Sequence, residues 1–184
     1  MEHLVFFLEG PSEKDFLERF LPKVMPAHIT THFQVFQGKQ DLEKQLVRRM
    51  KHWLLPNSGF LVMRDQDSGN CTTVKSQLRQ LCTEAGRPDA VVRIACREME
   101  TFFVGDWAAI ATGFGKPGLA TLAQKAKYRD PDLLGSPSIE IKRRIPSYQK
   151  REGARKIAPY LDLEKNKSRS FRVLVQALRR LAAS

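Results

Sequence analysis

The first half of the chain alternates short apolar runs with stretches in which apolar residues recur at helical spacing. Short apolar runs bounded by turn residues are typical of strands buried in a parallel sheet, and the helical period is typical of helices that cover such a sheet. The predicted strands are 4–8, 31–36, 60–63 and 90–95, and the predicted helices are one that starts at 12, then 41–54 and 74–85. This βαβαβαβ order predicts an α/β fold with a parallel sheet of about four strands flanked by helices.

The second half has a less regular pattern. We expect one helix over 98–110, an irregular segment over 113–145 with a short helix near 119–127, and two closing helices over 147–161 and 168–182. The pattern therefore predicts an α/β core over residues 1–112. Residues 113–184 are expected to add an irregular segment and a basic helical extension that packs on this core, so that the chain forms a single domain overall.

Charge is concentrated near the C-terminus. The whole chain has 31 Lys and Arg against 20 Asp and Glu, a net charge of +11, and residues 141–184 alone have 13 against 3. Such a basic segment favours a polyanionic partner such as nucleic acid, although a solvated helix face or an acidic partner protein would also account for it. The candidate backbone contacts in this segment are Lys142, Arg143, Arg144, Lys150, Arg151, Arg155 and Lys156, with Arg169, Arg172 and Arg179 on a common helix face.

The sequence indicates no membrane segment and no disulfide framework. Its apolar runs are far shorter than the ~20 residues that span a bilayer, and the N-terminus lacks the basic region of a signal peptide. The chain has three cysteines, which is an odd number, and no two of them form a Cys-x-x-Cys motif. We therefore expect a cytoplasmic protein with reduced cysteines and no membrane partner.

Acidic residues follow several of the predicted strands. In a parallel α/β sheet, ligands bind beyond the carboxyl ends of the strands, so acids placed there are candidates for a site. The alternative is that each acid is a turn or cap residue for the next helix. The acids in question are Glu9 after the first strand, Asp65 and Asp67 after the third, and Glu98 and Glu100 after the fourth.

Glu13 adds a further carboxylate one turn into the first helix. It precedes apolar residues of that helix by three, four and seven positions, which places it on the sheet-facing side, unlike Asp15 or Glu18. Carboxylates that converge need a cation, and oxygen ligands select Mg²⁺, Mn²⁺ or Ca²⁺ rather than zinc. An acidic metal pocket in a basic protein suggests hydrolysis of phosphodiesters.

At these residues the sequence resembles the TOPRIM domain that topoisomerases, primases and OLD-family (overcoming lysogenization defect) nucleases share. The matching motifs are Glu9-Gly10 after the first strand and Asp65-x-Asp67 after the third. The longer motif Glu9-Gly10-x-x-Glu13 makes the sequence most similar to small OLD-like proteins. Within that group it is similar to a bacterial family with further motifs along nearly the whole chain. Those motifs are Asp65-x-Asp67-x-x-x-Cys71, Arg97-Glu98-x-Glu100-x-Phe102, Tyr148-x-Lys150 and Ser170-Phe171.

The resemblance implies a TOPRIM (Rossmann-like) sheet and a set of roles. Two divalent metals, Mg²⁺ or Mn²⁺, would be bound by Glu9, Glu13, Asp65 and Asp67, with Glu98 or Glu100 as a further ligand. Glu9 and Asp65 would be catalytic through these metals, and Lys150 would stabilise the transition state. Arg97 would hold a phosphate or pair with a neighbouring acid.

The resemblance also implies a partner. OLD nucleases carry an ABC-type ATPase, but residues 113–118 here lack the spacing of a nucleotide-binding P-loop. A separate ABC- or AAA-type ATPase, encoded by a neighbouring gene, would then supply ATP hydrolysis, in defence against phage or mobile elements.

The function expected from these features is a metal-dependent endonuclease or nickase subunit that acts on DNA, with water as the nucleophile. Three alternatives stay open. RNA could be the substrate, as in small TOPRIM maturases. The chain could be a nucleic-acid-binding or regulatory subunit without catalysis. A phosphatase with an Asp-x-Asp nucleophile is less favoured, because that motif usually follows the first strand of its core.

Overall fold

A four-stranded parallel sheet forms the centre of the molecule in the computed structural model, which describes residues 1–183. The strand order is β2-β1-β3-β4, and every neighbouring pair is parallel. The strands are β1 (His3–Leu8), β2 (Thr30–Val35), β3 (Ser58–Asp65) and β4 (Val91–Ala95). The expected α/β class, with about four parallel strands flanked by helices, is confirmed and is consistent with a Rossmann-like fold.

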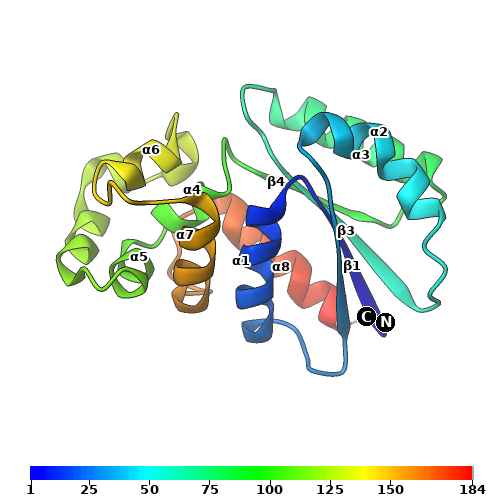
Figure 1. Ribbon diagram of the computed structural model, residues 1–184, viewed down its shortest axis with the longest axis horizontal. Coiled ribbons are helices and arrows are strands. Elements are labelled where there is room, and N and C mark those ends of the chain that lie inside the picture. The colour runs from blue at the N-terminus through cyan, green and yellow to red at the C-terminus, as the bar shows by residue number, and fades with distance from the viewer. Residues whose placement is uncertain (184) are drawn as a thin grey trace.

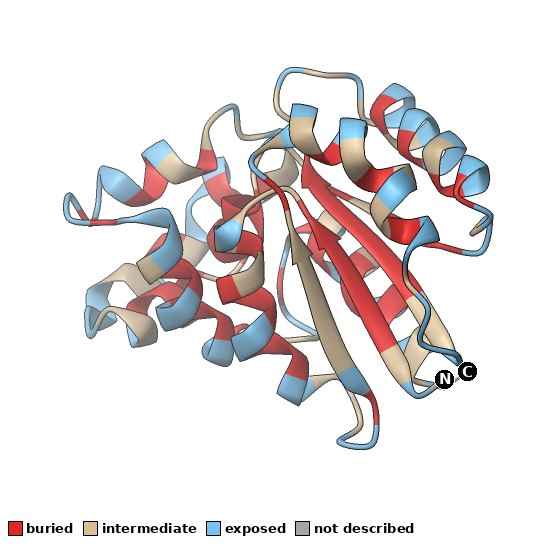
Figure 2. Ribbon diagram, turned by 45° about the vertical axis from the view of Figure 1, so that its right-hand side comes forward, coloured by how far each residue is buried: buried red, intermediate tan, exposed pale blue. Residues whose placement is uncertain are grey.

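Burial separates the central strands from the edges of the sheet. Residues 4–8 of β1 are completely buried, and so is most of β3, whereas the side chains of β2 are half-buried or exposed (Figure 2). The continuous apolar runs of β1 and β3 follow from this position, because both faces of a central strand are covered by helices. The edge strand β4 is partly open along its outer side.

Helices cover both faces of the sheet (Figure 1). On one face lie α2 (Lys39–Lys51) and α3 (Cys71–Glu84), which close a smaller apolar core with that face of the strands. On the other face, α1 (Pro11–Phe20) and α8 (Arg169–Ala182) belong to a larger core that also holds the remaining helices. This larger core combines side chains from residues 1–112 with others from the C-terminal part, such as Ile141 and Leu178.

The remaining helices form a lobe beside α1 (Figure 1). They are α4 (Glu100–Val104), α5 (Trp107–Gly113), α6 (Pro137–Lys142) and α7 (Lys150–Ile157). Short 3₁₀ helices connect the elements at Leu21–Lys23, Pro117–Gln124, Ala126–Tyr128, Pro131–Leu133 and Ala158–Tyr160. The short helix expected near 119–127 is therefore two 3₁₀ segments, and the helix expected over 147–161 begins only at Lys150.

The prediction of one helix over 98–110 is wrong, because the chain breaks at Gly105 and Asp106. The Asp106 carboxylate accepts hydrogen bonds from the backbone N–H of Ala109 (3.0 Å) and of Asp162 (2.8 Å), which caps α5 and fixes a distant loop. A Cβ on Gly105 would overlap the Asn166 side chain. These contacts join residues far apart in the chain, so the local apolar pattern could not indicate the break.

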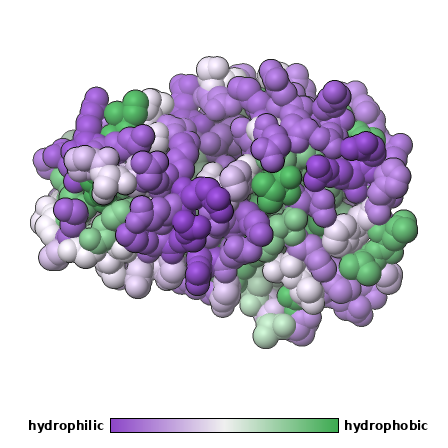
Figure 3. Space-filling view, viewed as in Figure 1, coloured by the Kyte–Doolittle hydropathy of each residue, from purple (hydrophilic) through white to green (hydrophobic). Residues whose placement is uncertain are grey.

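The surface shown in Figure 3 is mostly hydrophilic, with small separate hydrophobic areas. Within residues 1–183, none of the helices combines the length and the apolar character needed to cross a bilayer.

Candidate functional site

Three candidate carboxylates meet where β1 and β3 end and α1 begins. Glu9 follows β1, Asp65 is the last residue of β3, and Glu13 lies in the first turn of α1. Together with Lys150 of α7 they line a cavity of about 300 Å³. We call this cavity, with the adjoining Glu100, the acidic pocket. It lies at the sheet edge where the topology of a parallel α/β fold places ligands.

Glu9 joins the two strands at the floor of the acidic pocket. Its Oε2 accepts a hydrogen bond from the backbone N–H of Asp65 (3.2 Å) and lies 3.9 Å from the Arg64 Nε. Burial raises the pKa of Glu9 above its usual value, and this backbone hydrogen bond opposes the rise. The carboxylate is thus held across the gap between β1 and β3.

The Asp65 carboxylate has the least compensated environment of the group. The residue is 9% exposed, and its Oδ1 has no hydrogen-bond partner among residues 1–183. Burial raises the pKa of Asp65 well above its usual value, and the charges of Glu13 and Glu100 raise it further, whereas Lys150 lowers it. A buried oxygen without a partner is costly, which makes this atom a candidate ligand for a cation.

Glu13 faces the interior, as its spacing predicts. It is 4% exposed, its Oε2 accepts a hydrogen bond from the Ser12 hydroxyl (3.3 Å), and burial raises its pKa to about 7. A Cβ at Gly10 would lie 3.3 Å from the same oxygen, so the glycine of the Glu-Gly motif leaves room for this carboxylate. At neutral pH, Glu13 is therefore close to the point where it gains or loses a proton.

The expectation that Asp15 faces solvent is wrong, whereas Glu18 is exposed as expected. Asp15 is 6% exposed because α7 packs against α1 and covers it. The Arg151 Nε lies 2.6 Å from Asp15 Oδ2, and an Arg155 nitrogen lies 3.6 Å from Oδ1. The apolar spacing of α1 could not show that a second helix would cover this side.

A second pair of acids follows β4 and meets Lys150. The Lys150 Nζ lies 3.1 Å from Glu98 Oε2 and 3.4 Å from Glu100 Oε2. Burial works against the charge on Lys150, but Glu100 and Glu98 outweigh it and raise the pKa of the lysine above its usual value. Lys150 therefore stays protonated and is the cation that stands between these two acids and Asp65.

Tyr148 contacts one oxygen of the Glu100 carboxylate, and Lys150 lies near the other. Glu100 is 1% exposed, and the Tyr148 hydroxyl donates a hydrogen bond to its Oε1 (3.1 Å). Glu100 Oε2 has no hydrogen-bond partner, and burial raises the pKa of this carboxyl. The Tyr148 ring rests directly on Gly153, where any Cβ would overlap it. Helix α7 thus positions both groups that contact Glu100.

Asp67 lies at the margin of the acidic pocket and faces α2. Its Oδ2 is 2.9 Å from the Lys39 Nζ, and it is not among the residues that line the cavity. Asp67 and Arg97 both have positive φ, at 55° and 61°. The Asp67 N–H donates to the Arg97 carbonyl (3.0 Å), and the Arg97 guanidinium donates to the Asp67 carbonyl (3.3 Å), so the loops after β3 and β4 are joined. Strained backbone of this kind concentrates at functional sites.

Sequence reasoning missed Arg64, which supports the pocket from behind. It is 4% exposed, pairs with Glu43 of α2, and donates from its Nε to the Asp65 carbonyl (3.1 Å). A charged residue inside an otherwise apolar strand must find partners when it is buried. Arg64 within the apolar run of β3 was therefore a signal that could have identified it.

The donor set suits a hard divalent cation, although the side chains do not yet form a ligand cage. Within residues 1–183, no three His, Cys, Asp or Glu side chains are placed as a metal-holding group. The acids of the pocket supply carboxylate oxygens, the ligand type that Mg²⁺ and Mn²⁺ prefer. Among the described residues, Asp65 Oδ1 and Glu100 Oε2 are buried without hydrogen-bond partners. These residues fit a divalent ion if the carboxylates turn toward it.

Most of the basic candidates are engaged with acids of the same chain. Arg143 pairs with Glu140 (2.7 Å) and Lys156 with Glu152 (2.6 Å), in addition to the pairs that Lys150, Arg151 and Arg155 make. Lys142 and Arg144 are exposed near the end of α6. The structure therefore gathers the cations of α7 around α1 and the acidic pocket instead of presenting them as one open surface.

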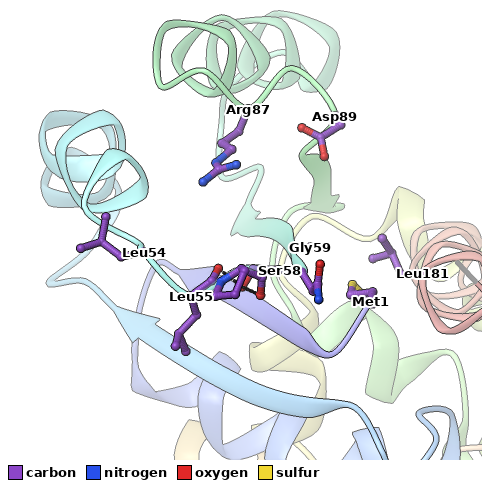
Figure 4. Close-up of a pocket in the computed structure, with 10 residues that line it drawn as sticks. Met1, Leu54, Leu55, Ser58, Gly59, Arg87, Asp89 and Leu181 are labelled. Carbon is purple, nitrogen blue, oxygen red and sulfur yellow. Dashed lines mark hydrogen bonds between the residues drawn. The ribbon is translucent and has the colours of Figure 1, made fainter.

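A larger cavity, of about 430 Å³, lies at the opposite end of the sheet (Figure 4). Its lining combines Arg87 and Asp89 with the hydrophobic Leu54, which is 88% exposed, and Leu55. It adjoins the start of β3 and contains none of the predicted site residues. Ligands of parallel α/β folds bind at the other end of the strands, so we assign the chemistry to the acidic pocket.

Comparison with known proteins places the chain in a family. No curated protein and no solved structure matches it. A family model matches residues 8–179, a range that includes every acid of the pocket. The chain therefore belongs to the family described as "Domain of unknown function (DUF4276)".

Proposed function

We propose that this protein is a Mg²⁺- or Mn²⁺-dependent nuclease that hydrolyses phosphodiesters of DNA. The observation that carries the proposal is the acidic pocket, in which Asp65 Oδ1 and Glu100 Oε2 are buried without hydrogen-bond partners beside a single lysine. Buried carboxylates repel one another and are costly to ionise. A bound divalent cation would remove both penalties at once.

Glu9, Glu13, Asp65 and Glu100 are the residues that would hold the metal, with Asp67 and Glu98 at the margin. Bound there, Mg²⁺ or Mn²⁺ would activate water and stabilise the leaving oxygen. Glu13 must lose a proton before it can bind a cation, which links metal binding to pH near 7. The ends of β1 and β3 position Glu9 and Asp65, and the first turns of α1 and α4 position Glu13 and Glu100.

Lys150 and Tyr148 have different roles in this proposal. Lys150 stays protonated and lines the same cavity as Asp65, so it can neutralise charge that develops on a phosphate in the pocket. Tyr148 is completely buried and hydrogen-bonded to Glu100, and burial raises its pKa, so it serves as a positioning residue and not as a nucleophile.

The TOPRIM assignment belongs to the same proposal. It is supported by the parallel four-stranded sheet and by the positions of Glu9 after β1 and Asp65 at the end of β3. We further propose DNA rather than RNA as the substrate, a separate ATPase subunit as the partner, a role in defence against phage or mobile elements, and a cytoplasmic location. Comparing cleavage of duplex DNA and structured RNA in one buffer tests the first of these points.

Plasmid cleavage tests the nuclease proposal directly. We expect Mg²⁺- or Mn²⁺-dependent nicking that EDTA abolishes and that Asp65→Asn lowers by at least about 10²-fold, because a central ligand is lost. Asp130→Asn makes the same chemical change at an exposed residue that does not line the pocket, and it should leave cleavage unchanged. Cleavage that persists in EDTA, or that survives Asp65→Asn, would contradict the proposal.

A second candidate is a nucleic-acid-binding subunit without catalysis. It is favoured by the finding that, in residues 1–183, no ready metal-holding group exists and that Lys150 already pairs with Glu98 and Glu100. Calorimetric titration with Mn²⁺ separates the two candidates. Binding that disappears in Asp65→Asn supports the nuclease, and no binding to the wild-type chain supports the subunit without catalysis.

A further inference from the structure

A groove runs along the outer edge of β4, between α3 and α8. Both helices pack against this edge strand, one on each face of the sheet. Two adjoining hollows, of about 330 Å³ and 390 Å³, follow the strand and share Lys75, Val92 and Arg93 in their lining. Of the nucleic-acid contacts expected from the sequence, Arg169 alone is among the described residues that line these hollows.

The cations of this groove come from three elements. Lys75 and Arg79 are one turn apart on α3, Arg93 lies on β4, and Arg169 and Arg180 lie on α8. Positions 169, 173, 176 and 180 share one helix face, since they are spaced at three- and four-residue intervals. We call these five side chains, with the hollows they surround, the basic groove. The five are Lys75, Arg79, Arg93, Arg169 and Arg180.

The basic groove differs from the other basic surfaces in that its charges are uncompensated. Within residues 1–183, none of its five cations forms an ion pair, whereas Arg172 bonds to the Asn166 carbonyl and Arg179 pairs with Glu164. Two acids, Asp89 and Asp132, are among the described residues that line the two hollows. Asp89 lines the hollow at the start of β4, and Asp132 at the far end already accepts hydrogen bonds from Ser168 and Ser170.

Arg93 gives the clearest indication that the groove can bind an anion. Its Nε is buried without a hydrogen-bond partner, and one terminal nitrogen donates only to the neighbouring Val92 carbonyl (2.7 Å). Burial lowers the pKa of Arg93, and the charges of Arg180 and Arg79 lower it further. An anion between α3 and α8 would relieve this repulsion, and it would satisfy the Nε if the Arg93 side chain turned toward it.

The length and direction of the groove fit a nucleic-acid backbone. Arg169 and Arg180 are eleven positions apart on one helix, which is about 16 Å, or roughly five base pairs of duplex DNA. Arg169 begins α8 beside Cys96, whose N–H lies 3.5 Å from the Ser170 hydroxyl, at the carboxyl end of β4. That is the strand end from which Glu98 and Glu100 follow.

We propose that the basic groove binds the sugar–phosphate backbone of DNA and leads it along β4 toward the acidic pocket. The direction toward the pocket rests on the proposed nuclease function, whereas binding itself does not. Four of the five cations are arginines, whose planar guanidinium groups bind phosphate with two hydrogen bonds. The alternative is that the groove binds an acidic protein segment, and the test must distinguish this from DNA binding.

The test is DNA binding in EDTA, where cleavage cannot occur. The probe is a fluorescein-labelled 20-base-pair duplex, followed by fluorescence anisotropy at 50 and 150 mM KCl. The groove variant is Lys75→Gln/Arg79→Gln/Arg169→Gln, and the charge-matched control is Lys14→Gln/Lys44→Gln/Arg48→Gln, three cations on α1 and α2. Circular dichroism melting shows that both variants are folded.

We expect the groove variant to bind at least tenfold more weakly, with a salt slope lower by about 2 to 3, and the control to stay within threefold of the wild type. Equal losses in both variants, no loss in the groove variant, or no binding by the wild type would overturn the proposal. The proposal would also be overturned if a poly-glutamate peptide displaced the labelled duplex as well as unlabelled duplex does, at the same total charge. Groove-dependent binding without cleavage would refute only the nuclease proposal, and Asp65-dependent cleavage with an unaffected groove variant would refute only the groove.

Discussion

The acidic pocket and the basic groove have opposite charge, but both contain buried polar atoms that lack hydrogen-bond partners among the described residues. In the pocket, buried carboxylate oxygens lack hydrogen-bond partners, and in the groove a buried guanidinium nitrogen lacks one. By contrast, α7 places Arg151 and Arg155 against a buried aspartate and leaves neither group unsatisfied. The comparison teaches that the position of a ligand is indicated by unmatched charge and not by the number of charges. The net charge of residues 141–184 cannot separate α7 from α8, because each of these helices carries four Lys or Arg residues.

Replacing Lys150 should have the largest effect, because this lysine is the one cation among the described residues that line the pocket. We expect Lys150→Met to lower kcat for plasmid cleavage by about 10²- to 10³-fold, the usual cost of losing one stabilising donor. Affinity for Mn²⁺ should not fall, because the pocket becomes more negative. Lys14→Met, on the surface of α1, is the matched control. A parallel loss of Mn²⁺ binding would show that Lys150 only supports the ligands.

Protonation of Glu13 should make the pocket, but not the groove, sensitive to pH. In the folded protein its pKa is about 7 instead of the usual 4.5, so between these values the folded chain holds the proton that the unfolded chain has released. Stability therefore falls as pH rises from about 5 to 7, by roughly 3 kcal/mol at most from this group.

Chemical denaturation of the metal-free protein at several pH values measures this effect. Glu13→Gln should match the wild type near pH 5 and be more stable near pH 7.5, whereas Glu18→Gln should follow the wild-type curve. Mn²⁺ should stabilise the wild type more at pH 8 than at pH 5. Equal pH dependence in wild type and Glu13→Gln would show that Glu13 ionises normally.

Salt should weaken DNA binding in the groove much more than Mn²⁺ binding in the pocket, whereas pH should affect mainly the pocket. If the groove neutralises about four phosphates, raising KCl from 50 to 200 mM should weaken duplex binding about a hundredfold. Mn²⁺ binding in the buried pocket should change much less, because buried charges are screened poorly. Anisotropy and calorimetry on the same preparation give both values. Similar salt slopes would mean that the pocket is open to solvent ions.

The smallest effect should come from the paired cations of α7. Arg151→Met leaves Asp15 with Arg155 alone, and we expect only a small loss in the free energy of unfolding, well below that of breaking a fully buried pair, because Arg151 is 57% exposed. DNA affinity should stay within twofold. A large loss of DNA binding without a loss of stability would place α7, and not α8, on the nucleic acid.

The fold and the acids of the pocket were within reach of the sequence because both depend on local pattern. The apolar runs of β1 and β3 fix the strand ends, and the strand ends fix Glu9 and Asp65. Glu13 follows from the period of its own helix. These features need only the residues on either side of them in the chain.

The features that escaped prediction depend on contacts between distant segments. Asp15 is buried by α7, 136 residues further along, and Gly105 ends α4 because Asn166 packs against it. Arg93 and Arg180 become neighbours only when α8 lies against β4. A single sequence shows which residues carry charge, but the partner that neutralises each charge is set by the tertiary structure.

Strand β4 connects the two regions, so DNA binding in the groove and metal binding in the pocket can be thermodynamically coupled. It carries Arg93 in the groove and leads, three residues beyond its end, to Glu98. If bound DNA changes the affinity for Mn²⁺ by some factor, bound Mn²⁺ must change the affinity for DNA by the same factor. A phosphate brought to the pocket adds negative charge beside the metal, so the coupling should be favourable. The protein would then bind its metal most tightly when DNA is bound, so that the substrate itself would promote metal binding.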